Sequence, residues 1–436
     1  MSDNVYYVKC NGFMILIANK ILTMVPSALP VNDGAVVLNR GTIIDLGSSA
    51  SMLQKYPGHR IQNLKNALVM PGLINVHTHL ELPPLLDVIR SKNLPDWVMG
   101  LIREKRKFSD QDYQTASKHN IQDLVKCGTT CVAEICTHGI SPQIVKSVGL
   151  RALIFHEVIS MGPDTGSGKI TVTSRLLSRL RRILNLHRMD TELIKTGLSP
   201  HAPYTISETA LTEIKRLAKD KNIRMCMHVA ESLDEIRLLQ GKKSGFDELY
   251  KAAGWELSWA PVSDSPFEYL GRLRLLGPNF LAVHAVLATD RDIKLIKKTG
   301  ASIAHCPRSN AQTKVGRLQL KKLLDEGIAV GLGTDSLASS PNLNLWDEMR
   351  YALRIHKRDG ICARDMMEIA TRGGARCLGM DKVIGTLEPG KKADLIAVPL
   401  PGRCSPNPYY DLLRETKTCI MSVVNGKIVH DIRSNR

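Results

Sequence analysis

Eight short apolar runs, each followed by polar residues and then by helical periodicity, constrain the fold of this chain more than any other feature. Runs of this length, bounded by turn residues and alternating with helices, are typical of buried parallel strands. Successive βα units over about 310 residues predict an α/β fold, a (β/α)8 TIM-like barrel whose active site lies at the C-terminal ends of the strands. The predicted strands are Leu73–Val76, Thr129–Ala133, Ala152–Phe155, Ile194–Leu198, Ile223–Met227, Phe280–Val283, Ala301–Ala304 and Ile328–Leu332.

Helical periodicity fills the intervals between these strands. Thr289, followed by Asp292, resembles a capping box at a helix start. The longest interval, residues 240–279, is rich in aromatic side chains and is either a lid over the site or plain packing, with Gly254–Pro261 predicted as a loop. The predicted helices are Asp112–Val125, Ser174–Leu186, Glu208–Lys219, Ser232–Leu239, Asp290–Lys298 and Leu318–Asp325.

Both ends of the chain have β-hairpin character instead. Ala35–Leu38 and Thr42–Gly47 flank a turn that contains Gly41, and an Asn-Gly turn follows Ile420–Val424. We therefore predict that residues 1–67 and 383–436 pair as one small β-sandwich domain, and that residues 68–382 form the barrel.

Composition and charge narrow the class of protein. No apolar run approaches the ~18 residues of a membrane span, and the ten cysteines form no C-x-x-C pair, which favours reduced thiols in a cytoplasm. The net charge of +17 is spread over short basic clusters without interleaved aromatic residues, so it favours a basic surface over nucleic-acid binding. We expect a small-molecule substrate, no nucleic-acid or membrane partner, and a homodimer or other homo-oligomer.

Four residues at predicted strand ends have the chemistry of a metal site. His77 and His79 end the first strand, where the alternation of side chains places both on one side. His228 ends the fifth strand and Asp335 follows the eighth. Three imidazoles and a carboxylate suit one divalent ion, zinc or iron, with a position left for a water whose pKa the ion would lower.

Further polar residues follow other strands. Glu231, three residues past His228, is placed to move a proton, and His284 lies across the predicted mouth. His201 and His305 either contribute to the chemistry or only line the pocket, and Glu81 is either a pocket residue or a loop carboxylate. Five histidines lie away from the predicted strand ends and are expected to be surface or packing residues: His59, His119, His187, His356 and His430. Candidate substrate-binding residues are His201, Arg308, Asn310, Ser336 and Glu81.

The motifs P-G-L-I-N-V-H-T-H, H-V-A-E, H-C-P-R-S-N and G-L-G-T-D-S resemble the amidohydrolase superfamily over about residues 1–430. They are most similar to its mononuclear branch, which includes cytosine, guanine, adenosine-type and S-adenosylhomocysteine deaminases and triazine hydrolases. The resemblance implies that Glu231 is the proton shuttle, that His284 and Asp335 activate the water, and that the metal ligands are His77, His79, His228 and Asp335. Dinuclear members need a bridging lysine or acid at strand four; here Lys195 lies too early and Ser199-Pro200-His201 ends that strand, which favours one metal.

Less specific phrases, among them H-A-P-Y-T and S-P-F-E-Y-L, look closest to aminodeoxyfutalosine deaminases of menaquinone biosynthesis. That resemblance implies deamination of an adenine nucleoside that carries a benzoate, with Arg308 or Arg106 as candidate partners of its carboxylate. Two alternatives stay open: another C–N or C–Cl hydrolase of the same branch, and a metal-free, non-catalytic scaffold.

Overall fold

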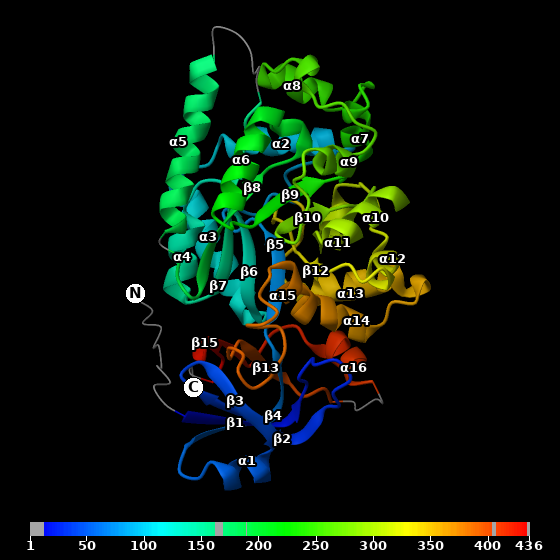
Figure 1. The fold of residues 1–436 in the computed structure, drawn as a ribbon. Coiled ribbons are helices and arrows are strands. Elements are labelled where there is room, and N and C mark those ends of the chain that lie inside the picture. Colours follow the sequence, from blue (N-terminus) through cyan, green and yellow to red (C-terminus); the bar gives the residue numbers. More distant parts are fainter. Residues whose placement is uncertain (1–12, 162–168, 189, 403–406, 434–436) are drawn as a thin grey trace.

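The computed structural model describes residues 13–161, 169–188, 190–402 and 407–433. They form a barrel with a smaller β domain at one end (Figure 1). The first strand of the barrel follows directly on a strand of the small domain, so that domain lies at the N-terminal ends of the barrel strands.

The barrel is a parallel sheet of eight strands that are neighbours in sequence order. It closes between its first and last strands, where the backbone N–H groups of Thr334 and Asp335 both donate to the carbonyl oxygen of His77 at 3.0 Å. All eight predicted strands are confirmed, and several extend further toward the mouth than predicted. The strands are β5 (Leu73–Thr78), β6 (Thr129–Cys136), β7 (Arg151–Val158), β8 (Ile194–Pro200), β9 (Met225–Val229), β10 (Phe280–His284), β11 (Ser302–His305) and β12 (Val330–Leu332).

Helices surround the barrel, and all six predicted ones are present. The capping box is also confirmed, because Thr289 and Asp292 each bond the other's backbone N–H. The other helices were not predicted, and two of them, Leu94–Lys105 and Leu345–His356, have 12 residues each. The helices are α2 (Leu94–Lys105), α3 (Asp110–Lys126), α4 (Ser141–Val148), α5 (Lys169–His187), α6 (Glu208–Asp220), α7 (Leu233–Leu239), α8 (Asp247–Ala253), α9 (Pro266–Arg272), α10 (Asp290–Thr299), α11 (Pro307–Gln312), α12 (Leu320–Asp325), α13 (Leu345–His356), α14 (Ala363–Glu368) and α15 (Gly374–Cys377).

The barrel wall separates two cores because neighbouring residues of a strand face opposite sides. Leu153, Phe155, Cys226 and Val283 belong to one buried cluster inside the barrel. Met225, Met227, Phe280 and Ala282 instead pack with side chains of α6 and α10 outside it, as members of the largest cluster. A residue's place in this alternation therefore decides whether it faces the barrel interior or the surrounding helices.

The two chain ends meet in one seven-stranded sheet, ordered β15-β14-β13-β4-β1-β2-β3. Strand β4 joins the ends because it pairs in parallel with β1 and antiparallel with β13. Both predicted hairpins are present, and the Asn425-Gly426 turn has φ of 49° and 74°, as a type I′ turn requires. The strands are β1 (Phe13–Ile21), β2 (Val31–Asn39), β3 (Thr42–Ser48), β4 (Arg60–Pro71), β13 (Leu395–Pro399), β14 (Met421–Val424) and β15 (Lys427–Asp431), and α1 (Ser49–Lys55) follows β3.

A buried ion pair joins the small domain to the barrel. Arg151 at the start of β7 donates from Nε and Nη2 to the two carboxylate oxygens of Asp394, at 2.6 and 3.0 Å. Asp394 also accepts the backbone N–H of Asn425 at 2.8 Å. Both side chains of the pair are only 2% exposed. Between the two sheets lies Gly72, where a Cβ would meet Thr130 Oγ1 at 2.0 Å.

The aromatic segment between β9 and β10 packs into the core. Phe246, Tyr250, Phe267 and Tyr269 are buried, and the hydroxyl of Tyr250 donates to the carbonyl oxygen of Tyr204 at 2.8 Å. These contacts favour the packing interpretation over the lid. In the described part of the chain, no helix combines the length and the apolar character that crossing a membrane requires.

Candidate metal and catalytic site

The predicted metal ligands converge at the mouth of the barrel. Nε2 of His77 and Nε2 of His79 lie 3.6 and 3.4 Å from Oδ1 of Asp335. The rings of His77 and His228 are 5.0 Å apart between centroids. His77 also forms a close group with His228 and His284, in which the ligand atoms lie within 4.8 Å of one another. Residues from four strand ends thus surround one position.

The state of the imidazoles fits a metal ion at that position. Among the described residues, neither ring nitrogen of His77 has a hydrogen-bond partner, although the side chain is fully buried. Burial lowers the pKa of His77 well below its ordinary value and that of His79 to about 4, so both are neutral, as metal ligands must be. Nδ1 of His228 donates to the carbonyl oxygen of His201 at 2.9 Å, which leaves Nε2 available for the ion.

Asp335 is held in its charged form. Its Oδ2 accepts hydrogen bonds from the hydroxyls of Ser309 at 2.6 Å and Ser339 at 3.1 Å, and Oδ1 faces the two histidines. Burial alone opposes the charge, but the neighbouring imidazoles of His77 and His79 outweigh it and hold the pKa of Asp335 well below its usual range. Three imidazoles and an ionised carboxylate suit one zinc or iron ion.

Glu231 and His284 lie close to each other beside the cluster. Oε1 of Glu231 lies 3.5 Å from Nε2 of His284. Burial raises the pKa of Glu231 to about 7, so its carboxyl group can both give and take a proton near neutrality. The amide oxygen of Asn310 accepts from Nδ1 of His284 at 2.8 Å and leaves Nε2 directed at Glu231.

The backbone at these strand ends is fixed in uncommon conformations. Ala230, His284 and Asp335 have φ of 52°, 70° and 57°. Such values in residues other than glycine cost energy and are retained where the surroundings enforce them, often at functional sites. Glu235 enforces one of them, because its carboxylate accepts the N–H groups of Ala230 at 3.0 Å and Glu231 at 2.8 Å.

Glu81 is a loop carboxylate, which corrects its assignment as a substrate-binding residue. Its two oxygens accept backbone N–H groups from Thr137, His138, Ile140 and Ser141 at 2.7–3.1 Å. These four donors belong to the loop from β6 into α4. The carboxylate therefore fixes that loop and has little capacity left for a ligand.

The guanidinium group of Arg308 is also hydrogen-bonded within the chain. Its Nε donates to Glu348 at 2.6 Å and its Nη2 to the carbonyl oxygen of Asn342 at 2.7 Å, which corrects its assignment as a partner for a substrate carboxylate. Ser336 accepts the N–H of Ala338 within its own turn, at 3.3 Å. Of the substrate-binding candidates, Asn310 is hydrogen-bonded to His284, and Ser336 is hydrogen-bonded within the turn after Asp335.

The sequence left the roles of His201 and His305 open, and the structure places the two histidines in different surroundings. The His201 ring lies 5.0 Å from that of His228, inside the mouth, and its Nδ1 bonds Thr205 Oγ1 at 2.9 Å. A contact between His201 and substrate stays a prediction. His305 is fully buried, with Nε2 3.3 Å from that of His356 on α13, and so belongs to the packing outside the barrel. Lys195 is exposed at the start of β8, away from the mouth, as one-metal binding requires.

Sequence analysis missed two charged residues near the mouth. Glu157 is the second-last residue of β7, and Lys105 ends α2. Burial of Glu157 opposes its charge, but His201, Lys105 and His79 together lower its pKa to about 2. The signal in the sequence was positional, because Glu157 follows the third predicted strand.

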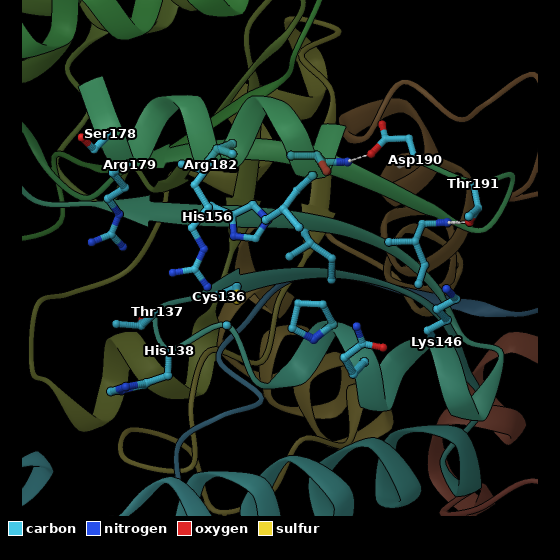
Figure 2. A pocket seen from close by; sticks show the side chains of 18 residues that line it. Cys136, Thr137, His138, Lys146, His156, Ser178, Arg179, Arg182, Asp190 and Thr191 are labelled. Atoms are coloured by element: carbon cyan, nitrogen blue, oxygen red, sulfur yellow. Dashed lines mark hydrogen bonds between the residues drawn. The ribbon is translucent and has the colours of Figure 1, made fainter. Parts of the chain in front are cut away.

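A separate cavity of about 490 Å³ lies on the other side of the barrel wall. His156 of β7 faces it, and Arg179 and Arg182 extend toward it from α5 (Figure 2). Arg179 also donates to the carbonyl oxygen of Glu157 at the top of β7. The cavity contains none of the residues of the metal cluster, because His156 and Glu157 face opposite sides of the sheet.

Comparison with known proteins identifies the family. The amidohydrolase family matches residues 68–429, most of the chain. The chain belongs to the amidohydrolase family.

Two relatives of this amidohydrolase are both named as deaminases. A 5-methylthioadenosine/S-adenosylhomocysteine deaminase from Syntrophobacter fumaroxidans is 28% identical over 397 residues, 88% of this chain and 84% of the relative. A 5'-deoxyadenosine deaminase from Methanosarcina acetivorans is 29% identical over 432 residues, 96% and 93% of the two chains.

Solved structures agree with this assignment. The amidohydrolase superposes on aminofutalosine deaminase from Helicobacter pylori, solved with methylthio-coformycin, with a TM-score of 0.84. The two are 23% identical, and the match covers 96% of this chain and all of the other, which confirms the fold. An adenosine deaminase from Xanthomonas campestris, solved with bound zinc, gives a TM-score of 0.78 at 25% identity and covers 95% and 92% of the two chains.

Proposed function

We propose that this amidohydrolase is a metal-dependent hydrolytic deaminase of an adenine nucleoside. One observation carries the proposal: a fully buried His77 with two unpartnered ring nitrogens lies among His79, His228 and Asp335, beside the protonatable Glu231. A chain that had kept the fold as a non-catalytic scaffold would have no reason to keep this costly arrangement. A divalent ion held there would lower the pKa of a water molecule and polarise the carbon under attack.

The residues of the chain supply the proton transfers. Asp335, ionised and held by Ser309, accepts the proton of the attacking water. Glu231 donates a proton to the ring nitrogen next to the amino-bearing carbon. Asp335 then passes the water's proton to the amine, which leaves as ammonia, and Glu231 recovers a proton from the hydroxyl group added to the ring carbon. His284, fixed through Nδ1 by Asn310, holds the water against the ring.

The names of the relatives support a 5′-modified adenosine as substrate. The aminodeoxyfutalosine of menaquinone biosynthesis is the member of this class that the sequence phrases favour, and the fold of the Helicobacter pylori enzyme is compatible with it. Because Arg308 is bonded to Glu348, the cation available for a substrate carboxylate is Lys105, whose charge reaches His79, His201 and Glu157.

The test is an ultraviolet assay of the adenine-to-hypoxanthine conversion, with ammonia release measured in parallel. The panel contains adenosine, 5′-deoxyadenosine, 5′-methylthioadenosine, S-adenosylhomocysteine and aminodeoxyfutalosine, with a chlorinated triazine as the comparison. We expect turnover of at least one nucleoside, dependent on added zinc or iron, with about one metal per chain. Turnover of the triazine alone would refute the proposed reaction, and turnover unaffected by metal removal would refute the metal site.

A further inference from the structure

Glu157 is placed to contact whatever fills the mouth of the barrel. Leu153 and Phe155 of the same strand belong to the interior cluster, so the alternation along β7 directs Glu157 inward as well. It pairs in register with Ser199 of β8, two residues before His201. Glu157 therefore stands on the interior wall, next to the histidines of the metal cluster, and not in the cavity that His156 faces.

The carboxylate of Glu157 has fewer partners than its burial demands. The residue is 6% exposed, and its Oε2 accepts one hydrogen bond, from the hydroxyl of Thr137 at 2.9 Å. Among the described residues, Oε1 has no hydrogen bond, and no cation lies within the 4.0 Å of an ion pair. Glu81, the neighbouring buried carboxylate, accepts four backbone N–H groups. Buried charged groups normally have such partners, so Oε1 is open to a donor from outside the chain.

A second polar atom on this wall is also unpartnered. Within the described part of the chain, Oγ of Ser199 has no hydrogen-bond partner, and its side chain is fully buried. The wall thus presents a strong acceptor and an unused hydroxyl side by side in register. Lys105 and the protein's metal position make the surroundings positive, which disfavours a cationic ligand. Neutral hydroxyl groups are the donors that suit such a wall.

We infer that Glu157 binds the sugar of the nucleoside, with its carboxylate accepting hydrogen bonds from the 2′- or 3′-hydroxyl. This inference rests on the proposed function. It makes Glu157 a substrate-binding residue that selects ribonucleosides over their deoxy counterparts. Ser199 Oγ lies beside it and completes the polar wall.

The test combines removal of the carboxylate with removal of each hydroxyl. Wild type and Glu157→Gln are assayed on 5′-deoxyadenosine, 2′,5′-dideoxyadenosine and 3′,5′-dideoxyadenosine. We expect the substitution to lower kcat/KM for 5′-deoxyadenosine by about 10- to 100-fold, mainly through KM, because it removes a hydrogen bond to a charged group. On the analogue that lacks the bound hydroxyl, the same substitution should change kcat/KM by less than about threefold.

Thr137→Val is the matched control, because it removes the one hydrogen bond that the Glu157 carboxylate receives from the described residues and keeps the carboxylate itself. It should keep most of the discrimination between the three substrates, with unchanged metal content and thermal unfolding. Equal losses by Glu157→Gln on all three substrates would overturn the inference and leave a structural role. Failure of wild type on every nucleoside of the panel would instead refute the proposed function, so the two failures are distinguishable.

Discussion

Strand β7 carries a buried charged residue near each end, and the two residues differ in the number of hydrogen-bond partners that the chain gives them. At its start, Arg151 meets Asp394 in a two-bond ion pair, to which Asn425 adds a backbone N–H. At its end, Glu157 has a single hydrogen bond, from Thr137, and an open carboxylate oxygen. Both residues are nearly inaccessible to water.

We interpret this difference as a division of roles along one strand, with the N-terminal end contributing to stability and the C-terminal end to function. The charges at the N-terminal end of the barrel are satisfied within the chain, so they fix the small domain to the barrel. At the mouth, Glu157, Ser199 and His77 keep polar atoms that have no partner among the described residues and that a metal or substrate could satisfy. In a TIM barrel this is the expected division between the stabilising end and the catalytic end.

Glu231→Gln should have the largest effect, a loss of activity without a loss of stability. The substitution removes the proton-transfer group, and we expect kcat to fall by about 10²- to 10⁴-fold. Metal content and thermal unfolding should stay at wild-type values, as metal analysis and calorimetry will show. Glu256→Gln, a change of an exposed carboxylate, is the control and should leave kcat unchanged. Retention of full activity by Glu231→Gln would remove Glu231 from the mechanism.

Asp394→Asn, at the N-terminal end of the barrel, should lower stability and leave activity unchanged. It leaves the buried Arg151 guanidinium without a counter-charge, so we expect the free energy of unfolding to fall by about 3–5 kcal/mol in urea titrations. The activity of the folded fraction should be unchanged. Glu213→Gln breaks the exposed pair with Arg216 and should cost no more than about 1 kcal/mol. A similar cost for both substitutions would show that the junction pair does not hold the domains together.

On the outer face of the same strand, His156 should make the stability of the protein depend on pH. Burial, reinforced by the charge of Arg179, lowers its pKa from 6.5 to about 4. Above pH 6.5 the imidazole is neutral in both states; as pH falls toward 4, only the unfolded chain takes up the proton, so stability is lost. At pH 5 this linkage costs about 2 kcal/mol.

We expect His156→Gln to lose less stability than wild type between pH 7.5 and pH 5, by about 2 kcal/mol in paired urea titrations. His119→Gln, at an exposed position on α3, is the control and should follow wild type. If His156→Gln also follows wild type, the imidazole is not held neutral in the folded protein.

Much of the molecule follows from local sequence. Each barrel strand is a short apolar run with turn residues around it, and the Asn425-Gly426 turn specifies its hairpin through two positive φ values. The convergence of the proposed metal ligands was predictable because a strand end is a local feature, and a (β/α)8 barrel gathers all such ends at one mouth. The family motifs point to the same residues.

The tertiary structure alone decided which charged residues are free. Glu81, Arg308 and Glu157 are all polar residues near predicted strand ends, and nothing local distinguishes them. Glu81 is satisfied by N–H groups more than 50 residues away in sequence, and Arg308 by Glu348, 40 residues away. Glu157 receives only Thr137. The sequence determined where polar groups gather, and long-range hydrogen bonds determined which of them remain for a ligand, because a buried charge takes every donor that the fold brings within reach.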